Sequence, residues 1–200
     1  DQTATTDTSA RSPDALLAEL KLRLEQNPSD REGWAILANA MMSLGDYTQA
    51  VGAYEKLYAL TGDDTEVLVG YADALAMLEG GILNDSVITL LDRALKIDPE
   101  QPQALWLAGM AAEARGDLPG ALEHWHRLKP ALHADPQAQS KLQALIDRVT
   151  ELAVSRGLAV ADNPQTVQRL NRPATPVTLT VRIETAPTLA TQIESSHTLY

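Results

Sequence analysis

From about Ser12 to Arg156 the hydrophobic residues recur at helical spacing, and part of this stretch repeats itself. The segment REGWAILANAMMSLGDYTQAVGAYEKL, which starts at Arg31, aligns with PQALWLAGMAAEARGDLPGALEHWHRL, which starts at Pro102. The offset between them, 102 minus 31, is 71 residues. Residues 65–101 share the same layout, with about three extra residues near Glu79–Gly81. The offset therefore divides into one unit of 34 residues and one of 37.

A period of 34 residues is that of the tetratricopeptide repeat (TPR), a pair of antiparallel helices that stacks on the next pair. In two of the units the helices would be joined at a Gly-Asp turn, Gly45-Asp46 and Gly116-Asp117. LLAELKLRLEQNP resembles the second helix of a further unit, and the helix after Pro136 would cover the last repeat. The pattern predicts an all-α TPR solenoid of three helix pairs with a leading and a closing helix.

Small residues recur where two paired helices must approach closely, and larger residues fill the remaining core positions. The small residues are Ala38, Ala72 and Gly109 on the first helices and Ala50 and Ala121 on the second helices. The residues assigned to these remaining core positions are Trp34, Leu37, Met41, Tyr54, Leu68, Tyr71, Leu75, Leu91, Leu105, Ala112 and Trp125.

The flanks of the helical stretch differ from it in composition. We expect residues 1–11 to be a disordered start, 12–156 the TPR domain and 157–175 a linker. In VTLTVRIE, apolar and polar residues alternate, which is typical of a strand. Residues 176–200 are therefore predicted to be a short β-prone C-terminal tail, either the start of a truncated β-rich domain or a disordered segment.

Charge and residue usage narrow the classes of function. The chain has 27 acidic and 16 basic residues, a net charge of −11, which argues against binding to nucleic acid. No apolar run approaches the ~18–20 residues of a membrane span. There is no cysteine, and His124 and His126 would point to opposite sides of a helix. We expect no catalytic residues, no metal site and no cofactor, and hence a protein that is not an enzyme.

A TPR solenoid offers a concave groove lined by the first helix of each pair. The positions assigned to this groove mix apolar side chains with carboxylates and include no Lys or Arg, so they suit an amphipathic helix with a basic face. The alternative is that they form only a solvated surface. The predicted peptide-binding residues are Glu32, Ala35, Asn39, Met42, Glu66, Val69, Asp73, Met77, Gln103, Trp106, Met110 and Glu113.

Residues 13 to about 155 resemble the TPR subunit of bacterial c-type cytochrome maturation, the CcmI/CycH type. The resemblance is carried by the leading helix ending in NPSD, the insertion at Glu79–Gly81, and ALWLAG followed by ALEHW. The related partner of nitrite-reductase haem attachment, the NrfG type, shares such features. The tail after residue 156 favours the CcmI/CycH type, in which a β-rich domain often follows the repeats.

The resemblance implies a periplasmic chaperone that binds the C-terminal helix of haem-free cytochrome c in the groove and presents it for haem ligation. It also implies other cytochrome c maturation subunits as partners, and attachment to the inner membrane through an N-terminal segment absent from this chain. A generic periplasmic TPR scaffold for a multiprotein assembly and an NrfG-type role remain the alternatives.

Overall fold

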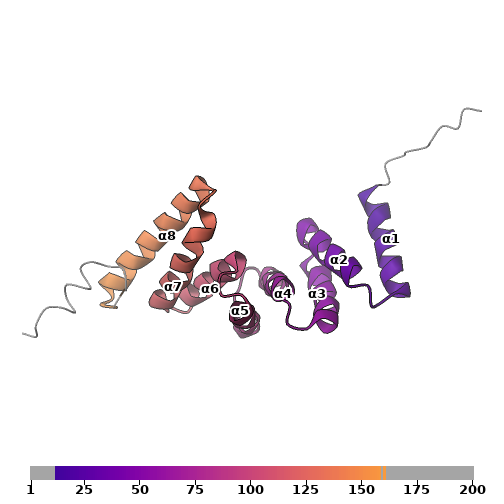
Figure 1. The fold of residues 1–200 in the computed structure, drawn as a ribbon, viewed down its shortest axis with the longest axis horizontal. Helices are drawn as coiled ribbons and strands as arrows, with labels where there is room; N and C mark the ends of the chain where they lie inside the picture. The colour runs from indigo at the N-terminus through magenta and orange to yellow at the C-terminus, as the bar shows by residue number, and fades with distance from the viewer. Residues whose placement is uncertain (1–11, 159, 161–200) are drawn as a thin grey trace, which may run out of the picture.

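The computed structural model describes residues 12–158 and 160, which form eight α-helices and one short 3₁₀ helix and contain no strand (Figure 1). The helices are arranged as predicted, with a leading helix, three helix pairs and a closing helix. The predicted disordered start, the β-prone tail and most of the linker lie outside the described residues. The helices are α1 (Pro13–Gln26), α2 (Arg31–Leu44), α3 (Tyr47–Thr61), α4 (Thr65–Leu78), α5 (Asp85–Ile97), α6 (Pro102–Ala114), α7 (Leu118–Leu128), η1 (Lys129–Leu132) and α8 (Pro136–Ser155).

The Gly-Asp turns have the conformation that their sequence requires. Gly45 and Gly116 have φ angles of 73° and 81°, in the left-handed region that glycine occupies at little cost. The aspartate that follows each glycine caps the next helix: Asp46 accepts a hydrogen bond from the backbone N–H of Gln49 at 3.1 Å, and Asp117 does so from Gly120 at 3.0 Å. Each dipeptide therefore ends one helix and starts its antiparallel partner.

The buried side chains form three successive hydrophobic clusters. The first contains Met41 and Tyr54 from α2 and α3, and the second contains Leu68 and Leu91 from α4 and α5. The third is built around Trp125 of α7, whose side chain has no exposed surface, and is closed by α8. Most positions predicted for the core are buried.

Small residues lie where the paired helices touch. Ala38, Ala50, Ala72 and Ala121 have no exposed surface. Gly109 of α6 faces the indole of Trp125, and a Cβ at this position would lie 2.6 Å from Cδ1 of that ring. The prediction of close helix approach at these positions is confirmed.

The structure differs from the sequence expectation in two respects: four predicted core residues, Trp34, Tyr71, Leu75 and Ala112, are only partly buried, and one residue of the predicted linker belongs to the core. Trp34 is only partly buried, because its indole Nε1 donates a hydrogen bond to the backbone carbonyl of Pro28 at 2.9 Å, at the edge of the first cluster. Val160, which was assigned to the linker, is 5% exposed and packs in the third cluster.

Ion pairs occur at equivalent positions of the second and third repeats. Arg93 of α5 pairs with Asp63 in the loop before α4, and Arg127 of α7 reaches Glu100 in the loop before α6 at 3.6 Å. The Arg93 guanidinium also lies over the ring of Tyr58, 5.3 Å from its centroid. In both cases a cation on a second helix is tied to the loop that enters its own repeat.

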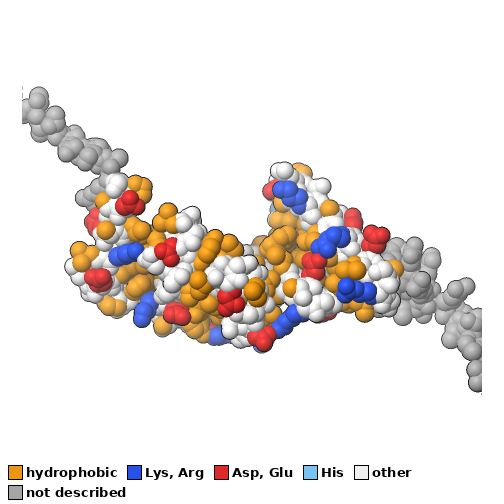
Figure 2. All heavy atoms as spheres, turned by 180° about the vertical axis from the view of Figure 1, so that it is seen from behind, with side chains coloured by type: hydrophobic (Ala, Val, Ile, Leu, Met, Phe, Trp, Pro, Cys, Tyr) orange, Lys and Arg blue, Asp and Glu red, His pale blue; other side chains and the backbone are white. Residues whose placement is uncertain are grey.

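The stacked helices form an open arch with α1 at one end and α8 at the other (Figure 1). Seen from behind, the molecule is hollowed along its upper edge, and hydrophobic side chains gather in that depression (Figure 2). Within the described part of the chain, no helix combines the length and apolar character that crossing a membrane requires.

Candidate peptide-binding groove

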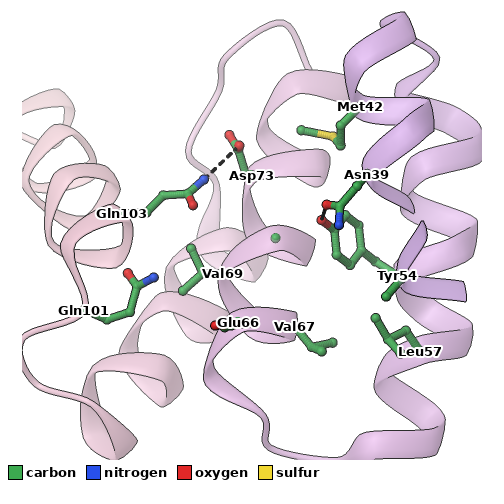
Figure 3. A pocket seen from close by; sticks show the side chains of 12 residues that line it. Asn39, Met42, Tyr54, Leu57, Glu66, Val67, Val69, Asp73, Gln101 and Gln103 are labelled. Atoms are coloured by element: carbon green, nitrogen blue, oxygen red, sulfur yellow. Dashed lines mark hydrogen bonds between the residues drawn. The ribbon is translucent and has the colours of Figure 1, made fainter. Parts of the chain in front are cut away.

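A hollow of about 410 Å³ opens between α2, α4 and α6, the first helices of the three pairs (Figure 3). We call it the acidic hollow. It is lined by Ala35, Asn39, Met42, Tyr54, Leu57, Glu66, Val67, Val69, Gly70, Asp73, Gln101 and Gln103.

Two hydrogen bonds fix the polar side chains of the acidic hollow. The Tyr54 hydroxyl donates to Oδ1 of Asn39 at 2.9 Å, which joins α3 to α2. The Gln103 amide donates to Oδ2 of Asp73 at 3.1 Å, which joins α6 to α4 (Figure 3). The polar groups of the hollow are thus held by contacts between helices, so its shape depends on how neighbouring helices are placed.

The electrostatics of the acidic hollow favour a cation. Its lining includes the carboxylates of Glu66 and Asp73 and no Lys or Arg. Burial raises the pKa of Asp73 above its ordinary value, although the hydrogen bond from Gln103 acts in the opposite direction. Burial, together with the nearby Asp73 charge, also raises the pKa of the Tyr54 phenol. A basic group entering the hollow would stabilise the half-buried Asp73 carboxylate.

The structure brings seven of the twelve predicted binding residues together in this hollow. Val69 is its most buried member, at 1% exposure, while Glu66 is exposed. The seven are Ala35, Asn39, Met42, Glu66, Val69, Asp73 and Gln103. Glu32, Met77, Trp106, Met110 and Glu113 do not line it. The binding role of all twelve stays a prediction.

Trp106 lines a second, smaller hollow of about 250 Å³ between α6, η1 and α8, which we call the apolar hollow. Its indole is 39% exposed. The apolar hollow is lined by Pro102, Trp106, Leu128, Leu132, Ala138, Lys141 and Leu142.

Glu113, expected to face a ligand, is held by the closing helix. The Arg148 guanidinium of α8 donates to Oε1 of Glu113 at 2.7 Å, and the Glu113 side chain is 26% exposed. Its charge is therefore already offset by a residue of the same chain. Because the groove residues were assigned from the first helices alone, the contact between Glu113 and α8 was not predicted.

Sequence reasoning also missed part of the acidic hollow. Tyr54 and Leu57 belong to a second helix and were assigned to the core or left unassigned, yet both reach the hollow. Gly70 allows this, because a Cβ there would lie 2.6 Å from Cζ of Tyr54. A glycine on a first helix, one turn from a groove position, is the signal that could have identified the aromatic residue behind it.

The sequence of the chain matches a known protein family. Residues 3–139 match the family model described as the cytochrome c-type biogenesis protein H TPR domain. The chain is 28% identical to CycH of Pseudomonas aeruginosa over 193 residues, which cover 94% of the chain and 45% of that protein. It is 29% identical to CycH of Bradyrhizobium diazoefficiens over 140 residues, which cover 70% of the chain and 38% of that protein. The chain therefore spans less than half the length of these two relatives.

A further relative is the NrfG subunit of the formate-dependent nitrite reductase complex of Escherichia coli O157:H7. It is 26% identical over 120 residues, which cover 60% of the chain and 61% of that subunit. Among solved structures, the MamA protein superposes with a TM-score of 0.55 at 19% identity, covering 69% of the chain and 77% of MamA. This structural likeness shows a common TPR fold.

Proposed function

The chain belongs to the cytochrome c-type biogenesis protein H family of TPR proteins, and from this premise we propose that it acts in cytochrome c maturation as a non-catalytic chaperone for haem-free cytochrome c. It binds the client's C-terminal helix in the concave groove and holds it for the subunits that attach haem. Because this chain has no cysteine, thiol chemistry on the client stays with other maturation proteins.

The observation that carries the proposal is the acidic hollow. Glu66 and Asp73 line it beside apolar side chains such as Met42 and Val69, with no cation among the lining residues. An amphipathic helix with Lys or Arg next to an apolar stripe is complementary to such a surface in both charge and polarity. Met42 supplies an unbranched side chain that adapts to different apolar partners, which suits a protein with more than one client.

The extent of the sequence match favours a CycH-type role over an NrfG-type role. The similarity to CycH of Pseudomonas aeruginosa covers 94% of the chain, whereas the similarity to NrfG covers 60%. With a CycH-type role we also propose a periplasmic protein that is attached to the inner membrane through a segment outside this chain and works beside the other cytochrome c maturation subunits.

Titration calorimetry with peptides that cover the C-terminal helix of candidate apocytochromes c tests the proposal. The decisive variant is the double substitution Glu66→Gln with Asp73→Asn, which removes both charges from the acidic hollow. We expect it to bind the peptide about three- to tenfold more weakly, since two partly exposed ion pairs are lost. Its binding should also depend less on salt concentration than that of the unmodified protein.

The matched control is Glu25→Gln with Glu151→Gln, two exposed glutamates on α1 and α8 that do not line the acidic hollow. It changes the net charge by the same amount, so long-range attraction alone would weaken both variants equally. Equal affinity of the two variants would remove the acidic hollow from the binding site. Absence of binding for every C-terminal peptide would contradict the proposed function itself.

A further inference from the structure

Two hollows of different charge lie on the two sides of helix α6. The acidic hollow has two carboxylates and no cation in its lining, whereas the apolar hollow has one cation, Lys141, and no carboxylate. Gln103 of α6 faces the first and Trp106, three residues later, faces the second. Residues three apart are neighbours on a helix surface, so the two hollows are adjacent.

Lys141 is available for an external partner. No ion pair or hydrogen bond links its side chain to another residue of the described part, 12–158 and 160. It lies in the second turn of α8, whose first backbone N–H groups are already satisfied: Asp135 accepts hydrogen bonds from Gln137 at 3.0 Å and Ala138 at 2.9 Å. An anion at this end of the groove would therefore meet the Lys141 ammonium rather than free backbone donors.

The size of the apolar hollow indicates what enters it. At about 250 Å³ it lies below the ~300–1,000 Å³ of pockets for drug-sized ligands. It therefore admits one or two apolar side chains rather than the whole face of a helix. An apolar side chain in this hollow, with an anionic group directly beside it, is the arrangement that the last residue of a protein chain presents.

On these grounds we propose a direction for the client: its carboxy-terminal residue occupies the apolar hollow with the terminal carboxylate on Lys141, and its basic residues, earlier in the sequence, lie over Glu66 and Asp73. This inference rests on the proposed function and adds to it the polarity of binding and the recognition of a free chain end. Packed helices are spaced by about 8–10 Å, so the path from α4 across α6 to α8 is roughly 16–20 Å. A helix of about 12 residues covers that length.

The test uses three peptides of about 16 residues, long enough for the path across α6. The first is an amphipathic sequence with Lys residues on one face of its amino-terminal half, an apolar last residue and a free carboxylate. The second is the same peptide with a carboxy-terminal amide. The third has the same composition, with the Lys residues moved to the carboxy-terminal half. Each is titrated by fluorescence anisotropy into the unmodified protein, Lys141→Gln and a control variant, Lys96→Gln, an exposed lysine that lines neither hollow.

We expect amidation to weaken binding to the unmodified protein and to Lys96→Gln by about three- to tenfold, the range of a partly exposed ion pair. For Lys141→Gln the free acid and the amide should bind within about twofold of each other, because the group that distinguishes them is gone. The peptide with reversed charge order should bind the unmodified protein more weakly than the first peptide.

Two outcomes would overturn the inference while the proposed function stands. One is binding of the free acid and the amide with equal affinity to the unmodified protein. The other is an equal loss on amidation in the unmodified protein and in Lys141→Gln, which would put the carboxylate elsewhere. Failure of all three peptides to bind would instead count against the proposed function, and the inference would fall with it.

Discussion

The substitution Gly109→Ala adds a single methyl group where α6 packs on α7, and we expect it to destabilise the protein although alanine is the better helix former. Gly109 is buried within α6. The new Cβ would lie 2.6 Å from both Cδ1 and Cε2 of Trp125, whereas non-bonded carbon atoms prefer about 3.5–4.0 Å. The indole or the helix must therefore move by about 1 Å.

The expected magnitude is the difference of two opposing terms. Replacing glycine by alanine inside a helix favours the folded state by about 1 kcal/mol. Overpacking a well-filled core costs about 1–3 kcal/mol, and the upper part of this range applies because Trp125 has no exposed surface and cannot turn outwards. The net loss should be about 1–2 kcal/mol in the free energy of unfolding.

Gly52→Ala is the matched control. Gly52 lies in the middle of α3, and a Cβ there would meet no atom within 4 Å. This variant should gain about 0.5–1 kcal/mol. Guanidinium-chloride unfolding of the two variants and the unmodified protein, followed by circular dichroism, should show midpoints shifted in opposite directions. A Gly109→Ala variant as stable as Gly52→Ala would refute the argument that Trp125 excludes a side chain at position 109.

Two further predictions concern the leading helix and the acidic hollow. Asp30 accepts a hydrogen bond from the Gly33 N–H at 2.9 Å and pairs with Arg23 of α1 at 2.8 Å. Asp30→Ala should therefore lower the free energy of unfolding by about 1–2 kcal/mol, whereas Asp30→Asn keeps the helix cap and should lower it less. Equal midpoints of the two variants in denaturant unfolding would contradict this. Burial raises the pKa of Asp73 above its value in the unfolded chain. Between these two pKa values the folded protein binds more protons than the unfolded chain, so its stability falls as the pH rises through this range. The melting temperature of Asp73→Asn should therefore exceed that of the unmodified protein most at neutral pH, and the difference should disappear below about pH 4. A difference in melting temperature that does not change with pH would refute this prediction.

The arrangement of helices could be predicted from sequence because each unit carries its own local signals. The Gly-Asp turns combine a glycine that adopts positive φ with an aspartate that caps the next helix, and neither depends on distant residues. The short helix η1 was not predicted. It arises because Pro130 has no N–H to continue the hydrogen-bond pattern of α7, which ends at Leu128.

The candidate site could be predicted only in part, because helix register tells which face a helix presents but not what its neighbours place in front of it. Asn39 and Asp73 followed from register, and both lie in the acidic hollow. Trp106 was assigned to the same groove, yet it lies across α6 because the closing helix and η1 form a separate hollow there. The pairing of Glu113 with Arg148 joins residues 35 apart in sequence, and no pattern within a repeat indicates it.

The acidic hollow lies at the seam between two hydrophobic clusters, since Tyr54 and Leu57 belong to the first and Val69 to the second. In a solenoid each repeat contacts mainly its neighbours, so one packed unit can rotate against the next with little change inside either. Such a rotation would change both the width of the hollow and the curvature of the array. We therefore expect a helix bound in the hollow to restrict the rotation of the first repeat against the second and, through it, the separation of the two ends of the arch.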